Sequence, residues 1–305
     1  MTTNVHRLSP MRRNEELAGW LFASPWILGF LLFTAGPMLI SAGFAFSEYN
    51  LLQPAQWVGT ANIEKALTGD PLVWQSLKVT TIYAFVSVPL QIVFGLIIAL
   101  LLNTNIRGLQ YYRTIYYLPS VLSGVAVALL WRWIYAPNYG LINAFLAGFG
   151  IQGPGWLSDA RWALPSLIGM SLWHVGGGIV IYLAGLQGVP TETYEAAEVD
   201  GAGWLTRFWH VTIPLITPVL FYQLIIGIIT ALQVFTQALI MTNGGPHDST
   251  LFFVLYLYRN AFQFFKMGYA SVLAWILFFY ILLLTLLVYR SSSVWVFYSG
   301  EVKRS

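Results

Sequence analysis

The sequence predicts an all-α integral membrane protein with six transmembrane helices. Hydrophobic residues make up 57% of the 305 residues and charged residues only 9%, whereas soluble domains carry about 25% charged residues. Apolar runs of the length that crosses a bilayer, about 20 residues, recur along the whole chain. The few charged residues gather between these runs. Together these observations favour one membrane domain over two soluble domains.

Composition also excludes several classes of protein. The sequence contains no cysteine, which excludes disulfides, thiolate catalysis and thiolate-bound clusters. The net charge of +3 is small and scattered, so no nucleic-acid partner is expected. The first apolar run is too long for the hydrophobic core of a cleavable signal peptide, and we expect it to stay in the membrane as an anchor.

The six apolar runs define the membrane domain, which we expect to cover residues 18–290. A polar lead, residues 1–17, precedes this domain on the cytoplasmic side, and a polar tail, residues 291–305, follows it. The predicted spans cover residues 18–46, 79–102, 114–135, 163–186, 215–240 and 268–289.

Prolines and loops interrupt this pattern at defined places. Pro25 and Pro37 are expected to bend the first span and Pro119 the third, since neighbouring helices satisfy the carbonyls that such prolines leave free. The loop after the first span is expected to hold a short amphipathic helix over residues 57–67. The loop 136–162 is rich in glycine and proline and predicts a short surface or re-entrant helix.

The distribution of Lys and Arg favours a topology with both termini on the cytoplasmic side. Under this topology the cytoplasmic side carries Arg7, Arg12, Arg13, Arg107, Arg113, Arg207, Arg290, Lys303 and Arg304. The outer side carries Lys65, Lys78, Arg132, Arg161, Arg259 and Lys266. Most of the outer residues lie in longer loops, which weigh little in this rule. Arg132 is expected at an interface, because arginine costs about 2.5 to 3.5 kcal/mol at the centre of a span.

The largest cluster of charge lies between the fourth and fifth spans, in residues 190–218, and predicts two short helices. Thr191 is placed to cap the first helix, and acidic residues follow in its early turns, where the helix dipole favours them. Gly201 ends this helix because glycine adopts the left-handed conformation of a C-cap, and Asp200 could cap either side of the break. The second segment covers residues 204–212, with apolar residues at helical spacing.

A motif runs through this charged stretch. It consists of Glu195, Ala196, Ala197, Gly201, Val211, Ile213 and Pro214. The pattern resembles the EAA loop of the membrane subunits of ABC importers, with a conservative departure at the two aliphatic positions. In that family the loop is the coupling helix that docks on the ATPase subunit, so the resemblance implies a cytoplasmic coupling loop over residues 190–214. The alternative interpretation is an ordinary acidic surface loop between two spans. The residues implied in coupling are Glu195, Ala196, Ala197, Asp200, Gly201 and Pro214.

Other segments extend the resemblance from about residue 15 to residue 289. The segment from Trp57 and residues 111–120, 241–250 and 261–275 look like the carbohydrate-type permeases, maltose- or glycerol-phosphate-like, of binding-protein-dependent importers. The resemblance implies the type I ABC importer permease fold and a multi-pass location in a bacterial or archaeal cytoplasmic membrane. It also implies a mono- or oligosaccharide as the cargo and alternating access as the mechanism.

The resemblance further implies a set of partners. They are a second homologous permease subunit, two cytoplasmic ABC ATPase subunits, an extracytoplasmic sugar-binding protein and membrane lipid. ATP and Mg²⁺ are expected on the ATPase subunits and no cofactor on this chain, which is not expected to be an enzyme. No lysine follows a glycine, so the phosphate-binding pattern G-x-x-x-x-G-K is absent from the sequence.

Histidines and carboxylates give no sign of a metal or catalytic site. The four histidines are far apart in the sequence, and no H-E-x-x-H pattern occurs. His174, in the fourth span, is expected to be a packed and hydrogen-bonded core residue. An integral membrane transferase, which needs a cluster of such groups, is a weaker alternative. A secondary transporter coupled to ions usually places an acid or base in the middle of the membrane, and no predicted span does so.

The fifth span carries a polar pattern that predicts a solute pathway. At 100° per residue, Gln223, Thr230 and Gln237 fall within about 40° of one another, and Gln233 lies about 40° further round the helix. Amides are costly in lipid, so this stripe must face protein or water, either lining a pathway or joining helices by hydrogen bonds. Neutral amides and hydroxyls suit a neutral, hydroxylated solute, although a sugar phosphate, amino acid or peptide remains an alternative cargo.

Aromatic residues near the outer ends of the spans are candidates for stacking on sugar rings. Trp131 and Trp133 are the two candidates in the third span. Tryptophan also collects at membrane interfaces as an anchor, and this is the more common role of such residues.

Overall fold

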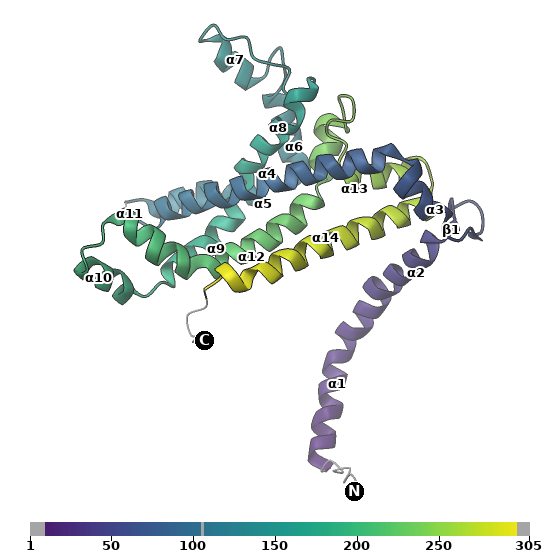
Figure 1. Cartoon of the computed structure of the whole chain (residues 1–305), viewed down its shortest axis with the longest axis horizontal. Coiled ribbons are helices and arrows are strands. Elements are labelled where there is room, and N and C mark those ends of the chain that lie inside the picture. The colour runs from purple at the N-terminus through teal and green to yellow at the C-terminus, as the bar shows by residue number, and fades with distance from the viewer. Residues whose placement is uncertain (1–9, 105–106, 298–305) are drawn as a thin grey trace. The chain divides into compact units, whose positions relative to one another are not determined.

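The computed structural model describes residues 10–104 and 107–297 of this chain, and these residues are mostly helical. The ends of the predicted lead and tail, residues 1–9 and 298–305, lie outside the described residues. The chain divides into two compact units. The first comprises residues 1–67 and 260–275, and the second comprises residues 68–259 and 276–305. Helix α14 (Met267–Trp295) runs from the first unit into the second (Figure 1).

The first unit begins with a long helical segment made of α1 (Pro10–Phe30), the π-helical turn η1 (Leu31–Ala35) and α2 (Gly36–Ala45). The helix continues through Pro25 and Pro37, the two predicted bends. The π-helical turn lies directly before Pro37, and the N–H of Gly36 donates to the carbonyl of Leu31, five residues back. A proline has no N–H to donate, so a local change in hydrogen bonding of this kind is expected beside it.

A small hairpin follows in the same unit. Strand β1 (Ser47–Glu48) pairs antiparallel with β2 (Gln56–Trp57). The predicted amphipathic helix is shorter than expected and forms α3 (Ala61–Glu64), which continues into the π-helical turn η2 (Lys65–Gly69). The side-chain amide of Asn62 donates to the carbonyls of Ala45 and Ser47 at 3.3 and 3.0 Å, and these hydrogen bonds tie the end of α2 to α3.

The core of the second unit is built on α4 (Pro71–Leu102), which packs along α12 (Ile213–Leu232) and α9 (Gly176–Gln187) (Figure 1). The Asp70 carboxylate accepts a hydrogen bond from the N–H of Leu72 at 3.1 Å and so caps the start of α4. Small residues bring these helices close together, as is typical where helices pack inside a membrane. A Cβ atom on Gly227 of α12 would lie only 2.8 Å from Val88 of α4.

The predicted third span is two helices and not one bent helix. Helices α5 (Leu109–Val121) and α6 (Gly124–Ile134) meet at an angle of 100°. The break falls at Leu122 and Ser123, whose backbone is extended, and not at Pro119, which lies inside α5. The proline removes one backbone donor but does not itself stop the helix, so the predicted position of the bend was wrong.

The fourth predicted span is also broken. Helix α8 (Ala160–Ser171) continues through a short 3₁₀ turn, η3 (Leu172–His174), and meets α9 at an angle of 50°. Three consecutive glycines, starting at Gly176, follow the break. The loop before α8 contains α7 (Leu141–Ala147), the short helix expected there.

The fifth predicted span ends early. Helix α12 stops at Leu232, and the π-helical turn η5 (Ala238–Thr242) lies beyond an irregular stretch. Phe252 and Phe253, at the start of α13 (Phe253–Tyr258), are fully buried. The π-helical turn η6 (Arg259–Gln263) follows α13. Within the predicted fifth span, residues 233–235 are therefore not helical, and a separate helical turn follows them.

The described residues contain four helices long and apolar enough to cross a membrane, and up to six spans if each bent pair is one span. The four long helices cover residues 14–45, 71–102, 204–232 and 267–295. The fold class predicted from the sequence, an all-helical membrane protein, is therefore confirmed, whereas the number of six spans stays a prediction.

Candidate functional site

Two adjoining cavities lie within the second unit, between α4, the α8–α9 break and α12. The first has a volume of about 140 Å³ and the second of about 440 Å³. Gln91, His174 and Thr230 line both cavities, so the two spaces meet at these side chains. The four predicted pathway residues divide between them: Gln223 lines the first, Gln233 and Gln237 the second, and Thr230 both.

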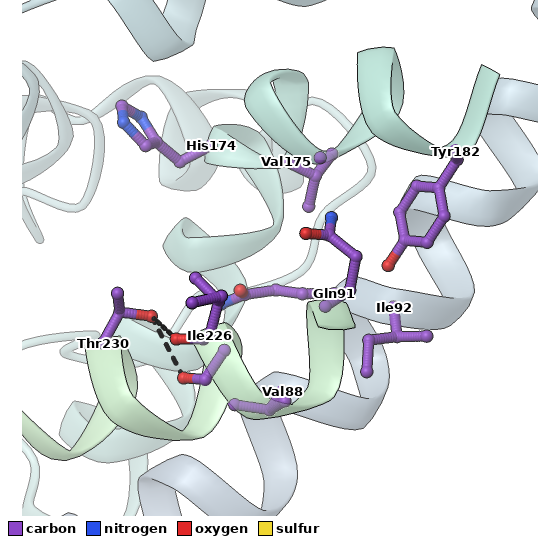
Figure 2. A pocket seen from close by; sticks show the side chains of 11 residues that line it. Val88, Gln91, Ile92, His174, Val175, Tyr182, Ile226 and Thr230 are labelled. Atoms are coloured by element: carbon purple, nitrogen blue, oxygen red, sulfur yellow. Dashed lines mark hydrogen bonds between the residues drawn. The ribbon is translucent and has the colours of Figure 1, made fainter. Parts of the chain in front are cut away.

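The first cavity is built around a polar pair on α9 and α12. Tyr182 of α9 and Gln223 of α12 both line this cavity. Gly178 makes room for this pair, because a Cβ atom there would lie 2.5 Å from the amide nitrogen of Gln223. Figure 2 shows Tyr182 on one side of this cavity, Thr230 on the other and Gln91 between them. The hydroxyl of Thr230 donates to the carbonyls of Ile226 and Gly227, at 2.8 and 3.1 Å, within its own helix.

The second cavity owes its shape to the end of α12. Gln233 is the C-cap of this helix, and its N–H donates to the carbonyl of Thr230 at 3.2 Å. Helical spacing predicted one stripe of Gln223, Gln233 and Gln237. It does not apply to Gln233 and Gln237, because the helix that contains Gln223 ends at Leu232. The irregular backbone itself brings Gln233 and Gln237 to the same cavity. Non-helical backbone at membrane depth is tolerated where it lines a cavity of this kind.

The lining is neutral and rich in hydrogen-bonding groups. The lining residues, all within the described part of the chain, include amides, hydroxyls and one imidazole but no Asp, Glu, Lys or Arg. Each neutral amide offers both donors and an acceptor, and each hydroxyl does the same. Such a lining can bind an uncharged solute that carries many hydroxyl groups, and it provides no fixed charge to bind an ion.

Three of the lining residues were not identified as site residues from the sequence. Gln91 is the single amide inside the apolar run of α4, and an isolated polar residue in a span is a signal that could have been used. Tyr182 is buried between α9 and its neighbours, and its type is common in membrane cores. His174 was expected in the packed core, but it is exposed and lines both cavities, so that prediction was wrong.

The candidate stacking residues lie away from both cavities. Trp131 belongs to an aromatic cluster, with ring centroids 5.2 Å from Tyr135 and 6.1 Å from Trp173. The Trp133 side chain is exposed. Neither residue lines the two cavities. Next to them, Arg132 donates a hydrogen bond to the carbonyl of Ile240 at 3.3 Å.

The predicted helical pair between α9 and α12 is present. Helix α10 (Thr191–Val199) is followed by α11 (Trp204–Arg207) and by the π-helical turn η4 (Phe208–Thr212), which leads into α12 (Figure 1). The first helix starts at Thr191, as expected, but Pro190 occupies the N-cap position and no side chain caps the helix.

The end of α10 explains the need for glycine in this turn. The N–H of Ala202 donates to the carbonyl of Ala197 at 2.9 Å, and the N–H of Gly201 to that of Glu198 at 3.0 Å. These two hydrogen bonds form a Schellman motif, in which the residue after the C-cap is left-handed. Asp200 is the C-cap, and Gly201 has φ of +79°. The predicted break is therefore a specific backbone conformation.

Two contacts hold the helical pair together and leave its tip free. The hydroxyls of Tyr194 and Thr212 lie 3.0 Å apart and form a hydrogen bond, and Arg207 forms an ion pair with Glu198 at 3.1 Å. Glu195 and Ala196 are exposed, and Ala197 is half-buried. Val199, at the tip, is 89% exposed. Acidic and apolar side chains are thus presented outward from the end of the helical bundle.

A model of one protein family matches two thirds of the chain. Residues 91–294 match the family described as the binding-protein-dependent transport system inner membrane component. The probable ABC transporter permease protein YesP of Bacillus subtilis is 44% identical over 293 residues, which cover 95% of this chain and 94% of that protein. The lactose transport system permease protein LacF of Rhizobium radiobacter is 33% identical over 291 residues, covering 93% of this chain and 97% of its own.

A solved structure shares the fold. The chain is similar, with a TM-score of 0.79 and 24% identity, to a chain of the bacterial alginate ABC transporter in complex with an alginate pentasaccharide-bound periplasmic protein. The match covers 92% of this chain and 95% of that one.

Proposed function

Because this chain belongs to the family of binding-protein-dependent transport system inner membrane components, we propose that it is the permease subunit of an ABC importer for a neutral sugar. The chain is a multi-pass protein of the cytoplasmic membrane with the type I importer permease fold, and it is not itself an enzyme. The proposal adds the cargo, the pathway and the set of partner subunits to this family membership.

The lining of the two adjoining cavities is the observation that carries the choice of cargo. Its amides and hydroxyls match the hydroxyl groups of a sugar, and it offers no arginine or lysine to pair with a carboxylate or phosphate. The relative from Rhizobium radiobacter is named for lactose, a neutral sugar. A second solved structure with this fold, at a TM-score of 0.80 and 24% identity, is a bacterial ABC transporter involved in the import of the acidic polysaccharide alginate. A charged cargo of that kind fits this lining less well. We therefore assign the pathway to Gln91, Tyr182, Gln223, Thr230, Gln233 and Gln237.

The proposed assembly has this chain paired with a second homologous permease. Two ATPase subunits would bind ATP and Mg²⁺ on the cytoplasmic side, and a sugar-binding protein would deliver the cargo on the other side. Six spans with both termini in the cytoplasm place residues 190–214 against an ATPase subunit. Closure of the ATPases on ATP would move this coupling loop and rock the helices about the cavities. Such a shift requires ligands that bind the two states with different affinity, and the loaded binding protein and ATP supply that difference.

Uptake of labelled sugar by cells that express the whole importer tests the pathway. We expect Gln233→Ala and Gln237→Ala to lower uptake while the amount of assembled complex stays unchanged, because each removes hydrogen-bonding groups from the second cavity. Gln110→Ala is the matched control, since Gln110 is an exposed amide on α5 that lines neither cavity. Unchanged uptake in both cavity variants would refute the assigned pathway. Competition by unlabelled sugar phosphates, amino acids and peptides separates the proposed cargo from the others.

Purification in mild detergent tests the coupling loop. We expect the wild-type chain to bring down an ATPase subunit and a second permease, and Glu195→Lys to weaken ATPase recovery and uptake together. Glu192→Lys is the control, because Glu192 is also exposed on α10 but lies outside the motif. Equal losses in the two variants would indicate a general effect of charge and would contradict a specific role of Glu195.

A further inference from the structure

A third cavity lies at one end of the second unit, apart from the proposed sugar pathway. It has a volume of about 260 Å³ and is enclosed by the end of α4, by α5 and by α9. None of its lining residues lines the two pathway cavities. The volume is close to the lower limit for small-molecule sites, which is about 300 Å³. The cavity is therefore large enough to hold part of a ligand.

The polar and apolar groups of this cavity are separated along its length. Arg113, near the start of α5, and Gln187, the last residue of α9, lie at the end of the bundle from which α10 and α11 project (Figure 1). Ile179, Val180 and Leu183 line the part that runs toward the middle of α9. A site with one charged end and one apolar wall matches a molecule with the same two parts.

Arg113 is the residue of this cavity that is suited to bind an anion. One of its terminal nitrogens donates to the carbonyl of Leu102 at 3.3 Å, and its Nε is buried without a hydrogen-bond partner. The two ion pairs found among residues 10–104 and 107–297 involve other arginines. The half-buried Arg113 therefore keeps a buried donor without a partner, and a guanidinium is suited to bind phosphate through several donors. The segment 103–113 carries two arginines and no acidic residue, so its local charge also favours an anion.

The place of the site in the proposed topology indicates which anion it binds. Under that topology, the start of α5 and the end of α9 lie at the cytoplasmic surface of the membrane, next to residues 190–214. Phosphate groups of the lipid bilayer lie at this depth, and basic pockets between helices on the cytoplasmic side bind anionic head groups. The apolar wall continues from there into the membrane, where the acyl chains lie.

We propose that this cavity binds an anionic phospholipid of the cytoplasmic leaflet. The lipid phosphate accepts hydrogen bonds from the guanidinium of Arg113, and an acyl chain lies against Val180 and Leu183. The choice of leaflet rests on the orientation given under the proposed function, whereas the lipid binding itself does not depend on the sugar or on ATP.

A photoactivatable phosphatidylglycerol tests the site in the full importer. The complex is reconstituted in phosphatidylcholine vesicles that contain this probe, and crosslinked peptides are identified by mass spectrometry. We expect crosslinks on α5 and α9, and a decrease of about tenfold in Arg113→Gln, the size of effect typical when a hydrogen-bonded charge is removed. Arg107→Gln is the matched control, since Arg107 is an exposed arginine of the same loop that does not line the cavity. Equal decreases in the two variants, or none, would overturn the proposal.

Two further arms keep the test decisive. Ala184→Phe fills the apolar part and leaves the arginine in place, so it should also abolish the crosslink, and a persistent crosslink would exclude the acyl chain from this cavity. Excess inorganic phosphate should not compete with the lipid probe, and full competition would identify a site for a free anion instead. If Arg113→Gln fails to assemble, Ala184→Phe decides the test, because a lost crosslink supports the site and a persistent one overturns it. All these readouts are made without sugar or nucleotide, so their failure is distinct from failure of the proposed transport function.

Discussion

Replacement of Gly201 tests whether the coupling loop needs one backbone conformation. Gly201 has φ of +79° in the Schellman motif that ends α10. An added Cβ atom would meet no other atom within 4 Å. The cost of Gly201→Ala within this chain is therefore the cost of the left-handed backbone alone, and steric overlap adds nothing.

That cost is about 1 to 2 kcal/mol for an ordinary residue, which lowers the population of the native turn relative to alternatives by a factor of about 5 to 30. Asparagine tolerates the left-handed conformation better than alanine because its side chain can form local hydrogen bonds. We therefore expect Gly201→Ala to impair coupling more than Gly201→Asn, although asparagine is the larger residue. A β-branched residue, as in Gly201→Val, should be the most harmful of the three.

The assay uses proteoliposomes that contain the whole importer. Sugar uptake is measured together with the stimulation of ATP hydrolysis by the loaded binding protein, so that coupling is the ratio of the two. If damage follows the size of the side chain, with asparagine worse than alanine, the limiting factor is space at a partner surface and our explanation from the backbone is wrong. If all three variants couple normally, the turn does not contribute to coupling.

Three further predictions concern packing and charge. Gly227→Ala should lower the melting temperature of the purified complex, because the new methyl group would lie 2.8 Å from Val88 and overpacking costs about 1 to 3 kcal/mol. Val88→Ala in the same chain should restore most of this loss. If the two substitutions instead lower the melting temperature additively, the contact is contradicted. Thr80→Val should also destabilise, by about 1 to 3 kcal/mol, since the fully buried hydroxyl of Thr80 accepts the N–H of Phe253 at 2.8 Å; Thr80→Ser keeps this acceptor and should melt close to the wild type. Glu198→Gln should change stability by less than about 1 kcal/mol, because the Glu198 side chain is 69% exposed in its ion pair; a large loss would show that the pair closes the coupling loop.

Local chemistry was sufficient to predict the first helix of residues 190–214 and the turn that ends it. The bounds of its first helix follow from Pro190, which precedes the helix, and from Gly201, which allows the left-handed turn that ends it. The second segment starts at Trp204 as predicted, but it does not end at Thr212, because the helix continues without a break into α12. Each of these features depends on residues within a few positions of one another, and the motif that led to the family lies in the same stretch. The family predicted from these residues is confirmed.

Helical spacing applies to only two of the four predicted pathway residues. Gln223 and Thr230 belong to one continuous helix, so helical spacing applies to them. Gln233 and Gln237 lie beyond the end of that helix, and only the irregular backbone brings them to the second cavity. Their place in a pathway remains a prediction.

The sequence by itself determined the class of the protein, the apolar segments and the turn at Gly201, because these depend on composition and on interactions between near neighbours. Only the tertiary structure decided where the third, fourth and fifth segments break and which polar groups meet. Gln91 and His174 are far apart along the chain and line the same two cavities because α4 packs beside the α8–α9 break. Packing of this kind depends on how residues far apart in the sequence fit together, as Val88 fits against the backbone of Gly227. A periodic pattern within one helix does not contain that information.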